Sequence, residues 1–289
     1  MGEDVGKLTF LSKKPTECPV CEARFPREEL HTGRGRLIAG DLSDELRRNY
    51  EPSLKYGEVY PLVYPLAVCP ECLYTAFPAD FGQVPPSSIP PLKDTTGDRQ
   101  RGIRSILPDL DFTRSRTLKE GAGSYFLALQ SYDHFPATFS PTIKQGLCAL
   151  RGAWLFSDLH KKYSNDNYDY ISRLFYRKAA FFYTRSIENE GSGKETVAEA
   201  ANLGPDLDKN YGYDGVMYLA ALLEYKYGPR TDREARVQSL INAKRIVARI
   251  FGMGKASKDK PAALLNNAKD LYTRLGEELA GDDEADEQA

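Results

Sequence analysis

Hydrophobic residues recur with the period of an α-helix through the second half of the chain. In each of several segments, apolar side chains spaced three or four positions apart would line one face of a helix. The pattern predicts helices over 125–132, 143–154, 171–182, 216–223, 237–251 and 264–279. Because most of the links between them are short, we expect a helical-hairpin body over residues 119–280, followed by an acidic tail over 281–289.

One fragment of this body, YRKAAFFYTRS, has the spacing of the second helix of a tetratricopeptide repeat (TPR). Ala179, Tyr183 and Ser186 give a small residue, an aromatic residue four positions later and a small residue three positions after that. The fragment YLAALLEYKYG resembles the first helix of such a repeat. Since no regular period of about 34 residues persists, the body is predicted to be TPR-like, with an ordinary helical bundle as the alternative.

Four of the five cysteines lie in two matched motifs, CPVC at 18–21 and CPEC at 69–72. The backbone N–H groups of such a turn point at the sulfurs and stabilise the thiolate form that metal binding requires. Two pairs complete a tetrahedral set, and four thiolates leave no open coordination position, so we expect one structural zinc ion. The predicted ligands are Cys18, Cys21, Cys69 and Cys72.

The surroundings of these motifs favour a zinc-ribbon-like, β-containing head over residues 1–81. Phe25 and Phe77 follow the two motifs and are placed to shield the site, and EVYPLVYPLAV is typical of an extended segment. The motifs are separated by 47 residues, against about 15–20 in the short form, so an insertion between them is expected. Thiol–disulfide chemistry and unrelated free thiols are the alternatives, although redox motifs usually open a helix beside a βαβ unit.

Between head and body, residues 82–118 contain two proline pairs together with serine, threonine and glycine. This composition predicts a Pro-rich linker or extended strap, with one short helix that ends at Pro108. The fold class expected for the whole chain is therefore mainly α, with a small β-containing head and a helical-hairpin body.

Charge and composition exclude few classes of function. The 289-residue chain has a net charge of −2, and residues 1–119 carry 17 basic and 17 acidic side chains, so binding of nucleic acid by the head is not favoured. No apolar segment is long enough for a membrane span and the N-terminus lacks the pattern of a signal peptide, so we expect a cytoplasmic protein.

No catalytic motif is found. The histidines are His31, His134 and His160, and none lies in a metalloprotease motif. GSGKET at 191–196 lacks the spacing of a phosphate-binding loop, and Cys148 lies on an apolar helix as a small core residue would. We therefore expect a protein that is not an enzyme.

A basic segment near the C-terminus is a candidate partner-binding surface. Nine lysines or arginines lie between Arg230 and Lys260, and Lys244, Arg245 and Arg249 fall within about one and a half turns of one helix. Such a patch would suit an acidic partner, with the acidic tail as an internal competitor. The alternative is a solvated helix face that the tail neutralises.

The motifs also resemble a known family. CPVC followed by ARF, the turn TGRGRL and the stretch YPLVYPLAVCPECLYTAFPADF, followed by helical hairpins, are similar to the bacterial family catalogued as domain of unknown function 2225. The opening block is most similar to spirochaete members. The resemblance covers most of the chain and implies a zinc-ribbon-like head and a TPR-like body in a cytoplasmic protein; it implies no reaction.

Together these features predict a non-enzymatic, zinc-binding scaffold or adaptor that binds a protein partner through its helical body. A regulatory protein that binds nucleic acid through the zinc ribbon is the alternative.

Overall fold

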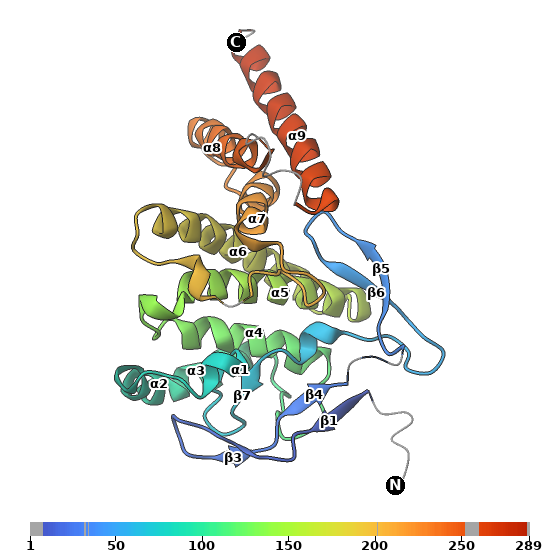
Figure 1. Ribbon diagram of the computed structural model, residues 1–289, viewed down its shortest axis with the longest axis vertical. Helices are drawn as coiled ribbons and strands as arrows, with labels where there is room; N and C mark the ends of the chain where they lie inside the picture. The colour runs from blue at the N-terminus through green and yellow to red at the C-terminus, as the bar shows by residue number, and fades with distance from the viewer. Residues whose placement is uncertain (1–7, 32, 34, 201, 252–259, 288–289) are drawn as a thin grey trace.

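The structure is a computed structural model that describes residues 8–31, 33, 35–200, 202–251 and 260–287. It is mainly helical, with small antiparallel hairpins in the first third of the chain (Figure 1). The predicted fold class is confirmed at this level. In the described part of the chain, every helix is too short or too polar to cross a lipid bilayer.

The two cysteine motifs lie at the tips of separate antiparallel hairpins. In the first hairpin, the outer strands β1 (Thr9–Leu11) and β4 (Glu28–Leu30) pair with each other. The inner strands next to the motif, β2 (Thr16–Glu17) and β3 (Arg24–Phe25), form a second pair. The second hairpin consists of β7 (Ala67–Val68) and β8 (Thr75–Ala76). These ladders are short, so they offer few hydrogen bonds of their own.

The long segment between the motifs forms a further hairpin, which we call the insertion hairpin. Its strands are β5 (Ile38–Leu42) and β6 (Arg48–Glu51), and their register shifts between Ala39 and Leu42. Figure 1 shows it beside the helices, away from the cysteine hairpins. A 3₁₀ turn, Pro61–Val63, then leads toward β7.

A buried carboxylate at the tip of the insertion hairpin bonds to the helices of the body. Glu45 accepts hydrogen bonds from the indole Nε1 of Trp154 at 2.5 Å and from the hydroxyls of Tyr176 at 3.0 Å and Tyr227 at 3.3 Å. The ammonium of Lys226 adds an ion pair at 3.1 Å. Buried carboxylates are stable when their oxygens are paired in this way. The segment predicted as an insertion is therefore a structural link between head and body.

Residues 82–106 are mainly helical and pack into the core, and do not form an extended strap. They follow α1 (Pro78–Phe81) and contain a 3₁₀ turn at Pro86–Ser88, α2 (Ile89–Asp94) and α3 (Thr96–Ile106). Leu92, Ile103 and Leu107 are buried in the core. The prolines are compatible with helix because they fall in first turns, where a backbone N–H is not needed. The short helix expected before Pro108 is confirmed as α3, and the division of the chain into two parts stays a prediction.

Each helix predicted for the body is present, and each is longer than the apolar pattern alone indicated. They are α4 (Leu118–Tyr132), α5 (Pro141–Lys162), α6 (Tyr168–Gly191), α7 (Gly212–Tyr227), α8 (Arg233–Phe251) and α9 (Ala262–Glu287), with 3₁₀ turns at Ala137–Phe139 and Val197–Glu199. Helix α9 carries most of the predicted acidic tail, and residues 288–289 lie outside the described residues.

Successive helices pack on one another, with α4, α5 and α6 in consecutive layers (Figure 1). Between α5 and α6 the approach requires glycine, because a Cβ on Gly152 would lie 2.5 Å from the ring of Phe175. Ala179, Tyr183 and Ser186, the TPR-like positions, are buried on α6. Burial alone does not distinguish a TPR-like array from a bundle, so the TPR-like character stays a prediction.

The helices and the cysteine hairpins share one contiguous core, which runs from Cys18 through Trp154 to Leu275. The chain between α6 and α7 closes one side of it. There the buried guanidinium of Arg151 donates to the carbonyls of Gly204 at 3.0 Å and Pro205 at 2.8 Å. The cysteines are thus placed by packing against the helices as well as by their own hairpins.

Candidate metal centre

The two cysteine motifs adopt the same turn. In the first, the N–H of Cys18 donates to the carbonyl of Ala23 at 2.9 Å, and the N–H of Glu22 donates to the carbonyl of Cys18 at 2.8 Å. The second turn repeats both bonds, between Cys69 and the residues five and four positions beyond it, at 2.9 and 3.0 Å. Identical sequence spacing has therefore produced identical backbone geometry.

Both turns also place one residue in the left-handed region. Glu22 and Leu73, each directly after the second cysteine of its motif, have φ of 64° and 58°. Residues with a Cβ adopt this conformation at a cost of about 1–2 kcal/mol. Because both turns have this strained residue directly after the second cysteine, we infer that the strained conformation is needed to place the sulfurs.

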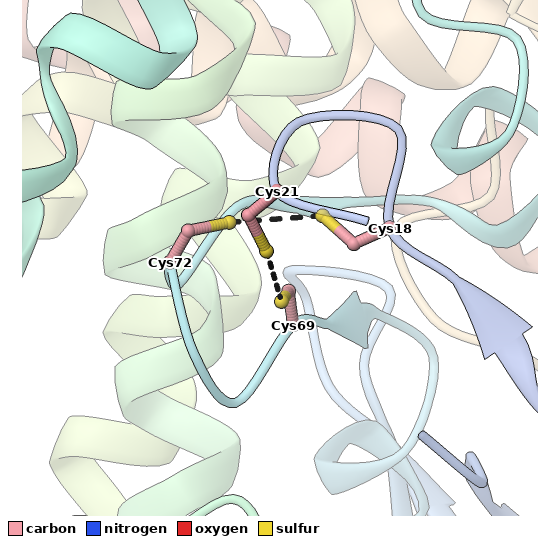
Figure 2. Close-up of side chains that lie close together, drawn as sticks. All are labelled: Cys18, Cys21, Cys69 and Cys72. Atoms are coloured by element: carbon pink, nitrogen blue, oxygen red, sulfur yellow. Dashed lines mark hydrogen bonds between the residues drawn. The ribbon is translucent and has the colours of Figure 1, made fainter. Parts of the chain in front are cut away.

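The four sulfurs gather from the two turns into one cluster (Figure 2). The Sγ atoms of Cys18 and Cys72 are 3.6 Å apart, and those of Cys21 and Cys69 are 3.5 Å apart. All four lie within 4.8 Å of one another. A tetrahedral ion with bonds of about 2.3 Å to sulfur requires sulfurs about 3.8 Å apart. The cluster therefore has the size of a mononuclear metal site.

The chemistry of the cluster also suits a cation. Hydrogen bonds from Cys18 and Cys72 lower the pKa of the Cys69 thiol to about 2, whereas the hydrogen bond to Cys69 raises the pKa of Cys18 to about 12. The pKa of Cys72 is raised as well, through its hydrogen bond with Cys18 and the burial of its thiol. The opposed directions of these pKa shifts follow from thiols that share protons within one closely packed cluster. A divalent ion would replace those protons.

Backbone N–H groups stabilise the thiolate form of the cysteines, as the C-x-x-C motif predicts. The N–H groups of Val20 and Cys21 are directed at the sulfur of Cys18 and favour its ionised form. Those of Glu71 and Cys72 do the same for Cys69. Such donors stabilise metal-bound thiolates, whose remaining negative charge needs partners.

Burial limits access to the cluster. Cys18, Cys69 and Cys72 are buried and Cys21 is half-buried. Of the two predicted shielding aromatics, Phe25 joins a buried cluster with Phe81, at a centroid distance of 5.9 Å. Phe77 instead packs near Tyr132 of α4, at 6.1 Å. The second aromatic therefore contributes to the contact between hairpin and helix.

A buried arginine that the sequence analysis did not identify supports the second turn. The guanidinium of Arg99, on α3, donates to the carbonyl of Cys72 from Nε at 3.2 Å and from Nη2 at 3.0 Å. Nη2 also donates to the carbonyl of Leu92 at 2.7 Å. Burial lowers the pKa of Arg99, while the nearby cysteines favour its charged form. No sequence signal marked this residue, because it lies in a segment whose composition suggested a linker.

Other residues considered as ligands or nucleophiles lie elsewhere. The ring of His31 packs at a tilt against that of Phe10, at a centroid distance of 4.6 Å, and His31 is not among the metal-ligating groups that gather in the described residues. Cys148 is fully buried on α5, and burial raises the pKa of its thiol to about 12. A thiol with such a pKa is a poor nucleophile near neutral pH.

The predicted basic patch is only partly assembled. Lys244 and Arg245 line a small hollow of about 330 Å³ on α8, where the Nζ of Lys244 lies 4.9 Å from the ring centroid of Tyr272. Arg249 is exposed further along the helix. Glu278 binds Arg236, which is buried, with an oxygen 2.9 Å from Nη2. This acidic residue therefore pairs with a basic side chain outside the predicted patch.

Comparisons with known proteins place the chain in a family. Residues 11–275 match the family described as "Uncharacterized protein conserved in bacteria (DUF2225)". A Borreliella burgdorferi relative described as "Uncharacterized protein" is 43% identical over 274 residues, which cover 94% of this chain and 98% of the relative. No solved structure matches the chain. The chain belongs to the DUF2225 family of bacterial proteins, which confirms the resemblance drawn from its motifs.

Proposed function

We propose that the protein is a non-enzymatic, cytoplasmic scaffold or adaptor in which four thiolates bind one structural zinc ion and the helical body binds a protein partner. The observation that carries the metal part is the convergence of four cysteine sulfurs within 4.8 Å of one another. Tetrahedral sulfur sites hold zinc or iron. Sulfurs 3.5 and 3.6 Å apart leave room for a single ion and not for a cluster of several irons.

A structural role for that ion follows from its ligands and surroundings. Four thiolates complete the tetrahedron, so no position is left for water or substrate. Zinc with four thiolates is dianionic, and Arg99 offers a buried positive charge beside Cys72. Charge compensation and a closed ligand set both favour a centre that holds the two hairpins together.

The exposed face of α6 supports the partner-binding part of the proposal. Tyr170, Leu174 and Phe181 are 55%, 37% and 62% exposed. Their spacing of four and seven residues places them on the same side of the helix. Single exposed apolar residues are ordinary, whereas a row of them along one helix is typical of an interaction surface.

Affinity capture from the native cell tests the proposal. The full chain, loaded with zinc, would be used as bait at low and high salt, with half of each sample treated with nuclease. We expect at least one protein to be retained after nuclease treatment. Capture that depends on intact nucleic acid would contradict the scaffold and support the alternative, a nucleic-acid-binding protein. Bait with Cys69→Ser controls for retention that depends on the metal centre.

A further inference from the structure

A groove of about 920 Å³ lies between α6 and the turn that joins α7 to α8. One wall is formed by successive turns of α6, with Arg173, Arg177, Phe181 and Arg185. The other is formed by the end of α7 and the residues after it, including Pro229. The volume is that of a site for a ligand with several side chains, and far exceeds that of a single small anion.

The charge of the groove is predominantly positive. Its basic side chains exceed its acidic ones; they are Arg173, Arg177, Arg185, Lys226 and Arg230 against Glu188 and Glu224. Four of these five basic residues already have an ion-pair partner: Arg185 pairs with Glu188 at 2.9 Å, Arg173 with Asp169 at 2.8 Å, Lys226 with Asp44 at 2.9 Å and Arg230 with Glu278 at 3.7 Å. Arg177 has no ion-pair partner among the residues that the structure describes. The groove therefore offers at least one free guanidinium to a carboxylate.

An apolar contact surface lies beside these arginines. Phe181 is 62% exposed, although it is one of the largest apolar side chains of the helix. Thr184 and Pro229 line the groove with it. A ligand that covered the Phe181 ring would gain hydrophobic free energy that the free protein leaves unused.

We propose that this groove binds an acidic peptide segment of the partner, with an apolar side chain against Phe181 and a carboxylate on Arg177. The inference rests on the proposed scaffold function and names the class of its partner. A peptide fits the mixed lining better than a nucleic acid does. Glu188 and Glu224 can accept hydrogen bonds from backbone N–H groups, whereas they would repel a continuous line of phosphates.

Fluorescence anisotropy with defined probes tests this. The zinc-loaded full chain would be titrated into short labelled peptides of three kinds: acidic with one central phenylalanine, equally acidic with alanine at that position, and the first peptide with lysine in place of each acid. A labelled single-stranded oligonucleotide serves as the fourth probe. We expect the acidic phenylalanine peptide to bind tightest, with affinity that falls as salt rises.

Two variants and one matched control locate the site. Arg177→Glu and Phe181→Ala change exposed side chains and should each weaken binding of the acidic phenylalanine peptide by about tenfold or more. Arg104→Glu makes the same change of charge at an exposed residue of α3, outside the groove, and should have less than about a threefold effect. Circular dichroism would verify that each variant keeps its helices.

The outcomes separate the groove from the scaffold function. Equal weakening by Arg177→Glu and Arg104→Glu would show a general charge effect and overturn the groove. Tighter binding of the lysine peptide or the oligonucleotide, or no binding of any probe, would overturn the acidic-peptide class. If the Arg177→Glu protein still captures its cellular partner at full strength, the scaffold function survives and the groove assignment is wrong.

Discussion

The cysteine hairpins and the helical body are stabilised by different means. The inner strands beside the cysteine motifs are two residues long, so their ladders alone cannot hold the turns in place. By contrast, α5 alone buries Trp154, Phe156 and Leu159 almost completely. The hairpins therefore depend on the metal centre in addition to the core that they share with the helices, whereas the helices depend on apolar packing.

The insertion hairpin joins these two regions. Its buried Glu45 is held by side chains from α5, α6 and α7, while its strands begin and end between the two cysteine turns. We therefore expect loss of the metal to destabilise the cysteine hairpins locally, and loss of Glu45 to weaken the contact between the hairpins and the helical body. The predictions below test that separation, from the largest expected effect to the smallest.

Removal of the metal centre should have the largest effect. In Cys69→Ser, the cysteine hairpins are expected to open, because structural zinc contributes on the order of 10 kcal/mol to the folding of small metal sites. The body should retain most of its helical circular dichroism, and hydrogen exchange should become fast around 18–25 and 67–76. Cys148→Ala, away from the cluster, should keep the metal. Equal loss of protection in α5 and in the hairpins would show that the two regions are not separately stabilised.

Glu45→Ala should destabilise the contact between the regions by about 2–3 kcal/mol, since it leaves the buried indole N–H of Trp154 and the hydroxyls of Tyr176 and Tyr227 without their acceptor. Lys226 keeps its ion pair with Asp44. Urea unfolding, followed by tryptophan fluorescence from Trp154, measures this loss directly. As a control, Glu58→Ala removes an ion pair with Lys162 in which the glutamate is 58% exposed, and should cost less than about 1 kcal/mol. Similar losses in the two variants would contradict the role given to Glu45.

Gly152→Ala tests packing inside the body alone. The added Cβ would lie 2.5 Å from the Phe175 ring, so overpacking should cost about 1–3 kcal/mol without loss of metal. Gly191→Ala, at the end of α6, meets no atom within 4 Å and should leave the unfolding free energy nearly unchanged. A thermal unfolding series compares them; loss of zinc in the Gly152 variant would show that the two regions are more tightly coupled than proposed.

The features that the sequence predicted are those that depend on local pattern. The apolar period located the helices of the body, because each buries one face along its whole length. The repeated C-P-x-C spacing identified the four cysteines that gather. Both signals lie within short segments.

What the sequence did not predict depends on contacts between distant segments. Glu45 and Trp154 are 109 positions apart, and an acidic residue between two short strands gives no sign that it will be buried. Arg99 and the helix α2 were missed because proline pairs suggested an extended chain. The prolines stand in the first turns of helices, where they are compatible with helical structure, and Leu92 is buried in the core, so this segment is helical.

The metal content of the purified protein tests the central claim most directly. The full chain, prepared without chelator, would be analysed by elemental mass spectrometry together with X-ray absorption at the zinc edge. We expect about one zinc per chain with four sulfur ligands at about 2.3 Å. Protein that contains no zinc, with Cys18, Cys21, Cys69 and Cys72 all freely titratable, would contradict the account.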